Sequence, residues 1–190
     1  LNESMRVGGN KMLVNLTRSM FVGLFSEFDA FIGNLLKILY DKKPSLLNSI
    51  NRELTLNEVI KFNSIESLKK DSLEREIDSF RRESYIEKFS LLENKFKIST
   101  LRKFPEWSEF VEMSQRRNLM THNDGIVSDQ YLKICKQHSC EAAKNLKPGE
   151  QLHIDGKYFS RACHVLSVVA FMLAYTLWRK VLPKDSGVVA

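Results

Sequence analysis

The chain has 190 residues and a mass of 22.0 kDa, which is enough for one well-filled hydrophobic core and too little for two full domains. Hydrophobic residues make up 43% of it and charged residues 27%, which excludes a disordered or fibrous protein. The formal charge of +6 and the pI near 9.2 would attract phosphates or an anionic surface. This charge permits a nucleic-acid partner without requiring one.

Cysteine content and hydropathy predict a cytoplasmic protein. The three cysteines are an odd number, too sparse for a disulfide framework, which is typical of a reducing compartment. The most apolar stretch, residues 165–178, is uncharged over 14 residues, whereas a spanning helix needs about 20, so we expect a buried helix and no membrane anchor. We expect no signal sequence. Because the first residue is Leu1, the chain either lacks a leader or is a piece of a longer protein, and both remain open.

The first predicted element is a long amphipathic helix from Lys11 to Tyr40, preceded by a flexible N-terminal segment, residues 1–10. Gly23 and Gly33 each lower helix propensity by about 1 kcal/mol relative to alanine, which favours close approach of another helix at both positions. Pro44 marks the expected end of this helix. Its apolar residues recur at spacings of three and four: Leu13, Leu16, Met20, Phe21, Leu24, Phe28, Phe31, Ile32, Leu35 and Leu39.

The middle of the chain shows ordinary helical signals. A short helix is predicted over Leu56–Phe62, because the Thr55 side chain can cap its start with Glu58 as the reciprocal partner. Between residues 64 and 98 an apolar stripe runs among charged residues of both signs. This pattern is typical of a solvated helix face with local ion pairs, and we assign it no function.

A second group of helices is predicted after Pro105. The helix that starts at Glu106 carries the candidate functional motif and should end at residues 123–125, Asn-Asp-Gly, which form a turn signature. A short helix over Asp129–His138 follows.

The C-terminal part begins with an insertion at residues 151–159, which we predict to be a small hairpin or an irregular loop. The last helix, Tyr158–Leu182, is apolar almost all round. Such a helix is usually buried in the centre of a bundle or in a dimer interface. Residues 184–190 are expected to form a C-terminal tail.

The candidate site combines a guanidinium, an amide and an imidazole on one helix. Asn118 and His122 are four residues apart and share a face. Arg117 and His122 are five apart, about 140° around an ideal helix, so Arg117 must reach sideways or be met by another surface. The last helical turn stabilises a protonated His122 by about 0.3–1 kcal/mol, while neighbouring Arg117 opposes this. A histidine so placed suits acid–base catalysis.

These residues carry a resemblance to a known family. Arg117, Asn118 and His122 resemble the RxxxxH motif of HEPN (higher eukaryotes and prokaryotes nucleotide-binding) domains. The continuation at 123–132, NDGIVSDQYL, and the ending at 177–183, LWRKVLP, resemble prokaryotic members. The resemblance implies an all-α, up-and-down helical bundle over residues 11–183, as one domain, with a short irregular or hairpin insertion before the last helix.

The resemblance also implies a metal-independent endoribonuclease that uses no cofactor. The 2′-hydroxyl of RNA would attack the adjacent phosphate, leaving a 2′,3′-cyclic phosphate and a 5′-hydroxyl. By position, His122 would move protons, Arg117 would hold the phosphate, and Asn118 would orient His122 or the phosphate. One histidine cannot readily be base and acid at once, so a homodimer with a composite site is expected.

The biological setting implied by the family is a bacterial toxin or antiviral defence system, including abortive infection. The substrate would be tRNA or another structured RNA, and an antitoxin or companion domain would be a further partner. A second hypothesis keeps the helical bundle but not the chemistry, as a non-catalytic HEPN-like module that binds RNA, a nucleotide or a protein. An intact Arg117, Asn118 and His122 favours the enzyme.

Structural explanations compete for several of these residues. An arginine and a histidine near a helix end can simply cap its C-terminal carbonyls. We interpret Arg116 as an exposed charge that steers RNA, hence a substrate-binding residue. Asp29 interrupts an apolar helix and is either a surface residue or a partner of the motif arginine.

Two further clusters contain residue types that bind ligands. Cys135, His138 and Cys140 include zinc-binding types, but their spacing matches no structural zinc pattern. We expect buried, hydrophobe-like cysteines and no metal. Aromatic residues just before the motif could stack bases, although such residues more often fill a core, and we favour the core. They are Phe104, Trp107 and Phe110.

Overall fold

The structure is a computed structural model that describes residues 2–49 and 53–182, with side chains described over 12–48 and 53–182. Within these ranges the regular structure is helical, apart from one isolated β-bridge between Ile126 and Gln151. The all-α class predicted from the sequence is therefore confirmed. The helices are α1 (Asn2–Lys42), α2 (Leu56–Val59), α3 (Ile65–Arg82), α4 (Tyr85–Phe96), α5 (Trp107–His122), α6 (Asp129–Gln137) and α7 (Gly156–Val181), with 3-10 turns at Pro44–Ser49, Leu101–Lys103 and Glu141–Ala143.

The chain folds into two compact units inside the predicted single domain. Among the described residues, the first comprises 2–28 and 102–172, and the second comprises 29–49, 53–101 and 173–182. α1 and α7 each contribute residues to both units. The candidate motif on α5 belongs to the first unit.

The predicted first helix is present and is longer than expected, but its apolar stripe is buried only from Phe21 to Leu39, whereas Leu13, Leu16 and Met20 are at least 50% exposed. α1 begins at Asn2, so the segment predicted to be separate, residues 1–10, is helical from Asn2 onward. At Gly33 an added Cβ would lie 2.7 Å from Nη2 of Arg81, so glycine lets the α3 arginine lie against α1. The same expectation fails at Gly23, where no described residue lies within 4 Å of such a Cβ.

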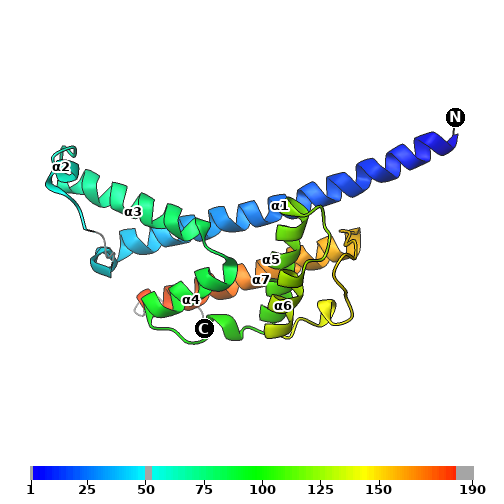
Figure 1. The fold of residues 1–190 in the computed structure, drawn as a ribbon. Coiled ribbons are helices and arrows are strands. Elements are labelled where there is room, and N and C mark those ends of the chain that lie inside the picture. The colour runs from blue at the N-terminus through cyan, green and yellow to red at the C-terminus, as the bar shows by residue number, and fades with distance from the viewer. Residues whose placement is uncertain (1, 50–52, 183–190) are drawn as a thin grey trace, which may run out of the picture. The chain divides into compact units, whose positions relative to one another are not determined.

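In the first unit, aromatic rings of α1 and α5 form the core. Phe21, Phe25 and Phe110 are fully buried, and the Phe28 and Phe110 ring centroids lie 5.4 Å apart. Burial of each such ring contributes about 1.5–3 kcal/mol. Phe104, Trp107 and Phe110 are all at most 8% exposed, so they fill the core, as the sequence favoured, and are not available to stack bases. α6 packs against α5 in the same unit (Figure 1).

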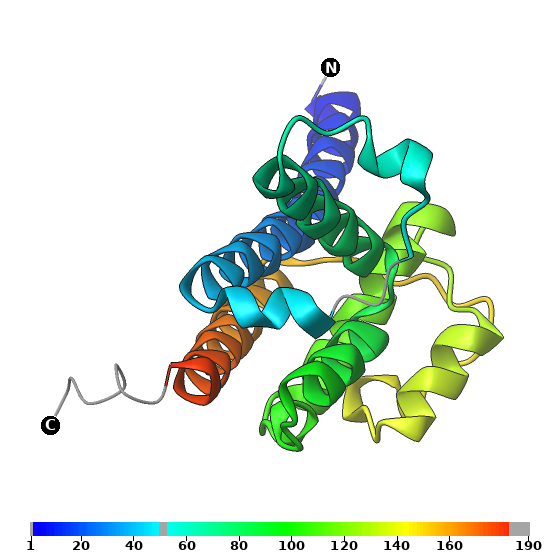
Figure 2. The same ribbon diagram turned by 90° about the vertical axis from the view of Figure 1, so that its left-hand side faces the viewer.

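In the second unit, α3 lies alongside the C-terminal part of α1 (Figure 1, Figure 2), where Lys37 donates to Glu74 over 2.9 Å. The apolar stripe predicted between residues 64 and 98 forms two helices, because Ser84 starts α4 with its own capping box. The predicted box of Thr55 and Glu58 is also present, at the start of α2. The core here draws on α1, α3, α4 and α7: Ile32, Leu39, Ile77, Phe89, Leu92, Leu173 and Leu177.

The last helix is covered on one face rather than all round. Ala162, Val165, Val169 and their neighbours along this face are buried, but Phe171 is 67% exposed and Tyr175 is 49% exposed. By length and composition alone α7 could cross a membrane, and it is the only helix in the described part of the chain to meet that criterion. The segment before it forms no strand among its described residues, which favours the irregular loop over the hairpin. The predicted tail, 184–190, lies outside the described residues.

Candidate functional site

The candidate motif occupies the last two turns of α5, and the backbone after it is tightly closed. The amides of Asn123 and Gly125 both donate to the carbonyl of Leu119, over 2.9 and 3.0 Å. Asp124 and Gly125 have φ of 49° and 79°, in the left-handed region that favours glycine. A Cβ on Gly125 would lie 2.8 Å from the carbonyl oxygen of Leu152, so only glycine fits this turn. His122 is thereby held at a defined helix end.

The three motif side chains lie at or near the surface. Asn118 and His122 are exposed, and Arg117 is half-buried. Nη1 of Arg117 donates to Oδ1 of Asn118 over 3.1 Å. Nε of Arg117 is covered and has no hydrogen-bond partner among the described residues. The motif thus presents an amide-held guanidinium and an exposed imidazole on the same part of α5.

Arg117 differs from other arginines of its unit in having no carboxylate partner among the residues that the structure describes. Arg116 is paired with Glu112 over 2.7 Å, and Arg161 with Glu109 over 2.6 Å. A guanidinium without a carboxylate keeps its charge available for an external anion, and its planar donors match a phosphate.

Arg18 of α1 is a residue that the sequence reasoning missed. Its guanidinium donates to the carbonyl of Met120 and to the carboxylate of Asp124, on either side of His122. These contacts anchor the C-terminal end of α5 to α1 and satisfy one of the terminal helix carbonyls. Arg18 and Asp124 are 106 residues apart in sequence, so no local pattern could have revealed their contact.

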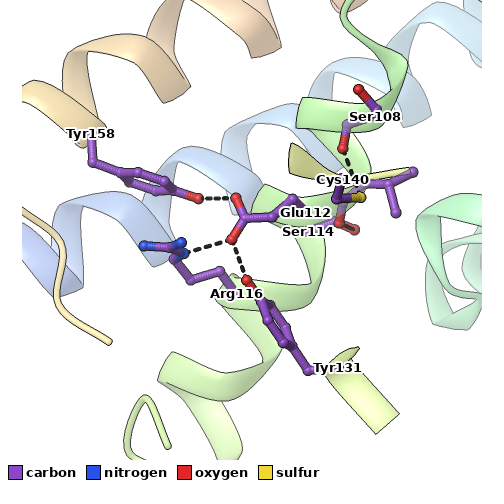
Figure 3. A network of polar contacts seen from close by, with 8 residues as sticks. Ser108, Glu112, Ser114, Arg116, Tyr131, Cys140 and Tyr158 are labelled. Carbon is purple, nitrogen blue, oxygen red and sulfur yellow. Dashed lines mark hydrogen bonds and ion pairs between the residues drawn. The ribbon is translucent and has the colours of Figure 1, made fainter. Parts of the chain in front are cut away.

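A buried polar network surrounds Glu112 and includes Arg116, the residue directly before Arg117 (Figure 3). The Glu112 carboxylate accepts hydrogen bonds from Tyr131 of α6 over 2.5 Å, Tyr158 of α7 over 2.7 Å and Nε of Arg116 over 2.7 Å. The Arg116 guanidinium also lies 4.1 Å from the Tyr158 ring centroid. Burial and the nearby Glu112 carboxylate raise the pKa of both tyrosines, so they remain protonated donors.

This network corrects the interpretation of Arg116. Arg116 is 8% exposed and forms an ion pair with the buried Glu112 carboxylate, so the expectation of an exposed RNA-steering charge is wrong. Sequence reasoning missed it because the network's tyrosines come from two other helices. The spacing of Glu112 and Arg116, four residues apart on one helix, was the available signal.

Asp29 forms an ion pair with Lys88, which neither alternative drawn from the sequence predicted. Its carboxylate accepts from the Lys88 ammonium over 2.7 Å, and the Lys88 side chain is 3% exposed. Lys88 also lies 4.4 Å from the Tyr85 ring centroid. A buried lysine needs such compensation, which explains an acidic residue inside an otherwise apolar helix. Asp29 is therefore interpreted as a structural residue.

Cys135 and Cys140, for which the sequence predicted buried cysteines and no metal, lie at the C-terminal end of α6. The amide of Cys140 donates to the carbonyl of Cys135 over 2.9 Å, and Ser139 between them has φ of 55°. This is a Schellman motif, which brings those two side chains together. Both cysteines are buried, and the Cys140 thiol donates to the carbonyl of Ser108 over 3.1 Å. No group of three metal-ligating side chains occurs among the described residues.

Comparison with known proteins adds no relative to this description: no family model, no curated protein and no solved structure matches the chain.

Proposed function

We propose that the chain is a cytoplasmic, metal-independent endoribonuclease whose active site contains Arg117, Asn118 and His122. The observation that supports the proposal is the state of Arg117. It is half-buried, held by Asn118 and without a carboxylate among the described residues, one turn before the exposed His122. A cation and an imidazole so placed can bind a phosphodiester and move its protons.

The proposed reaction is transesterification within RNA. His122 takes the proton of the 2′-hydroxyl while the 2′-oxygen forms a bond to the adjacent phosphorus. The bond from phosphorus to the 5′-oxygen breaks, and this oxygen takes a proton from a second imidazole. The Arg117 guanidinium stabilises the charge that develops on the phosphate oxygens. The products are a 2′,3′-cyclic phosphate and a 5′-hydroxyl.

The second imidazole is proposed to come from another copy of the chain. Leu13, Leu16 and Met20 follow one another at helical spacing on α1 and are 66%, 55% and 50% exposed. A contiguous exposed apolar face of this kind favours association, and a self-complementary dimer is the commonest form. A twofold dimer would supply two arginines and two histidines to one cleft.

The family resemblance supplies the proposed setting and the competing function. RNA cleavage of this kind fits a bacterial toxin or antiviral defence system that acts on tRNA or other structured RNA. An antitoxin or companion domain would then restrain it. The alternative is a HEPN-like module that binds RNA, a nucleotide or a protein without cleavage.

The deciding experiment incubates labelled total RNA with the protein in EDTA. We expect cleavage to persist with the chelator and to disappear with His122→Ala. His153→Ala, an exposed histidine in the loop before α7, is the matched control and should leave cleavage unchanged. Cleavage that stops with EDTA, or survives His122→Ala, contradicts the mechanism. RNA binding without cleavage by the wild type supports the alternative.

The chemistry of the ends provides a second test. Attack by the 2′-hydroxyl requires that group, so a 2′-deoxy substitution at the cleaved position should stop the reaction and leave binding nearly intact. Binding should weaken steeply as salt rises, because arginine and lysine contacts with phosphate release counterions. Products with 3′-hydroxyl and 5′-phosphate ends would point instead to metal-assisted hydrolysis.

A further inference from the structure

The second unit contains a hollow that is separate from the candidate motif. Its volume is about 600 Å³, and it is lined by residues of α1, α3 and α4 and the turn after α4. This volume lies within the range of about 300–1,000 Å³ that is usual for small-molecule sites. Leu36, Ile77 and Leu92 give it an apolar wall, and all three are buried.

The most informative residue lining the hollow is Tyr40, because of its buried hydroxyl. Tyr40 is 3% exposed, and its hydroxyl oxygen is covered and makes no hydrogen bond of ordinary geometry to any described residue. A buried hydroxyl without a partner destabilises the folded state, because it loses its hydrogen bonds to water. A phenylalanine would fill the same space without this cost. The hydroxyl therefore indicates that something outside the described chain accepts its hydrogen bond.

Lys95 places a cation beside this hydroxyl. Its ammonium donates to Glu76 over 2.6 Å and lies 5.2 Å from the Tyr40 ring centroid, with a side chain 17% exposed. Burial alone would lower the pKa of Lys95, but Glu76 and the Tyr40 hydroxyl hold it above its usual range. An ammonium has three N–H donors. Glu76 accepts from one of them, and the Tyr40 oxygen lies beside the ammonium without a hydrogen bond of ordinary geometry, so Lys95 has a donor left for a ligand.

We propose that this hollow binds a small organic monocarboxylate with an apolar body. The Lys95 ammonium turns toward the ligand and donates to one carboxylate oxygen, which uncovers the Tyr40 hydroxyl as the donor to the other oxygen, while the apolar body contacts Leu36 and Leu92. Two carboxylates, Glu76 and Glu83, also line the hollow, so a polyanion would be repelled. The proposal concerns the second unit and does not rest on the ribonuclease mechanism.

The test uses hexanoate and benzoate as probes on the full chain, with 1-hexanol and sodium chloride as controls for apolar binding and ionic strength. We expect the two carboxylates to raise the thermal unfolding midpoint in a saturable way and the controls not to do so. The decisive variant is Tyr40→Phe. Without ligand, its midpoint should equal or exceed that of the wild type, because the unpaired hydroxyl is removed.

The same substitution should weaken carboxylate binding, although it does not lower the unfolding midpoint of the unliganded protein. Tyr40→Phe loses a hydrogen bond to a charged group, so carboxylate affinity should fall about tenfold or more. Tyr175→Phe removes an exposed hydroxyl outside this hollow and is the matched control, with affinity unchanged. The proposal is overturned if neither carboxylate binds, if 1-hexanol stabilises equally, or if Tyr40→Phe binds as tightly as the wild type. A lower midpoint for unliganded Tyr40→Phe also overturns it, because water then satisfies the hydroxyl.

Discussion

Nη1 of Arg117 donates a 3.1 Å hydrogen bond to Oδ1 of Asn118, the next residue on α5. On an ideal helix Asn118 is about 100° from Arg117 but only about 40° from His122. The hydrogen bond therefore draws the guanidinium toward the face that carries His122. Asn118 therefore braces the arginine, which differs from both roles drawn from the sequence, to orient His122 or to orient the phosphate.

The first prediction concerns this brace. Asn118→Ala should lower RNA cleavage about tenfold to a hundredfold, because a misplaced group forfeits part of the orientation effect. Asn118→Asp should be more damaging, since a carboxylate would neutralise the arginine. Cleavage rates on labelled RNA, with circular dichroism to check folding, measure both effects. Full activity in Asn118→Ala would remove Asn118 from the site.

The second prediction separates two adjacent arginines. Arg116→Met leaves the buried Glu112 without its cation, so the free energy of unfolding should fall by about 3–5 kcal/mol. Arg117→Met breaks no ion pair among the described residues, so stability should change by less than about 0.5 kcal/mol while cleavage is lost.

Urea unfolding and RNA cleavage, measured on both variants, give the comparison. Equal destabilisation by the two substitutions would show that Arg117 is structural as well. Retained cleavage in Arg117→Met would exclude the proposed role of its guanidinium.

The contrast between local and distant signals explains what the sequence predicted well. The helix periods and the capping pair Thr55 and Glu58 leave a trace within a few residues, and the structure confirms them. The partners of Arg18 and Asp29 are 106 and 59 residues away, and such pairs leave no periodic pattern. Arg116 was misjudged because charge alone predicts exposure, whereas a buried carboxylate four residues earlier reverses that expectation.

The motif itself could be found because its members are close in sequence and end a helix. The absence of a carboxylate partner for Arg117 among the described residues could not be predicted in the same way. Whether Arg117 is paired depends on which carboxylates other helices bring near it, which is a property of the packed unit. The orphaned hydroxyl of Tyr40 is hidden from the sequence for the same reason.

The third prediction concerns stability at high pH. Tyr131 and Tyr158 have raised pKa values in the folded protein, because burial and Glu112 disfavour the phenolate. The unfolded chain loses these protons near pH 10 while the folded chain keeps them. Stability from the network is therefore present below about pH 10 and is lost as pH rises above it.

Urea unfolding between pH 8 and 11, a range set by the usual tyrosine pKa of about 10, should show this decline. Tyr131→Phe should make the decline shallower, whereas Tyr175→Phe, which lies outside the network, should not. A pH dependence unchanged by Tyr131→Phe would show that other groups cause it.

The last prediction is that the active unit is a homodimer with a composite site. Arg117→Ala and His122→Ala should each be inactive alone. Mixed with wild-type chains after subunit exchange, His122→Ala chains should lower cleavage by more than their share of the chains, because a mixed dimer holds one imidazole where the proposed reaction uses two. Leu16→Glu places a charge on the exposed apolar face of α1 and should yield an inactive monomer, measured by sedimentation. Ile60→Glu, at a 70% exposed position after α2, is the matched control and should remain dimeric and active. If mixed dimers form but cleavage follows the number of wild-type chains, while the Leu16→Glu monomer cleaves at the full rate, each chain carries its own complete site.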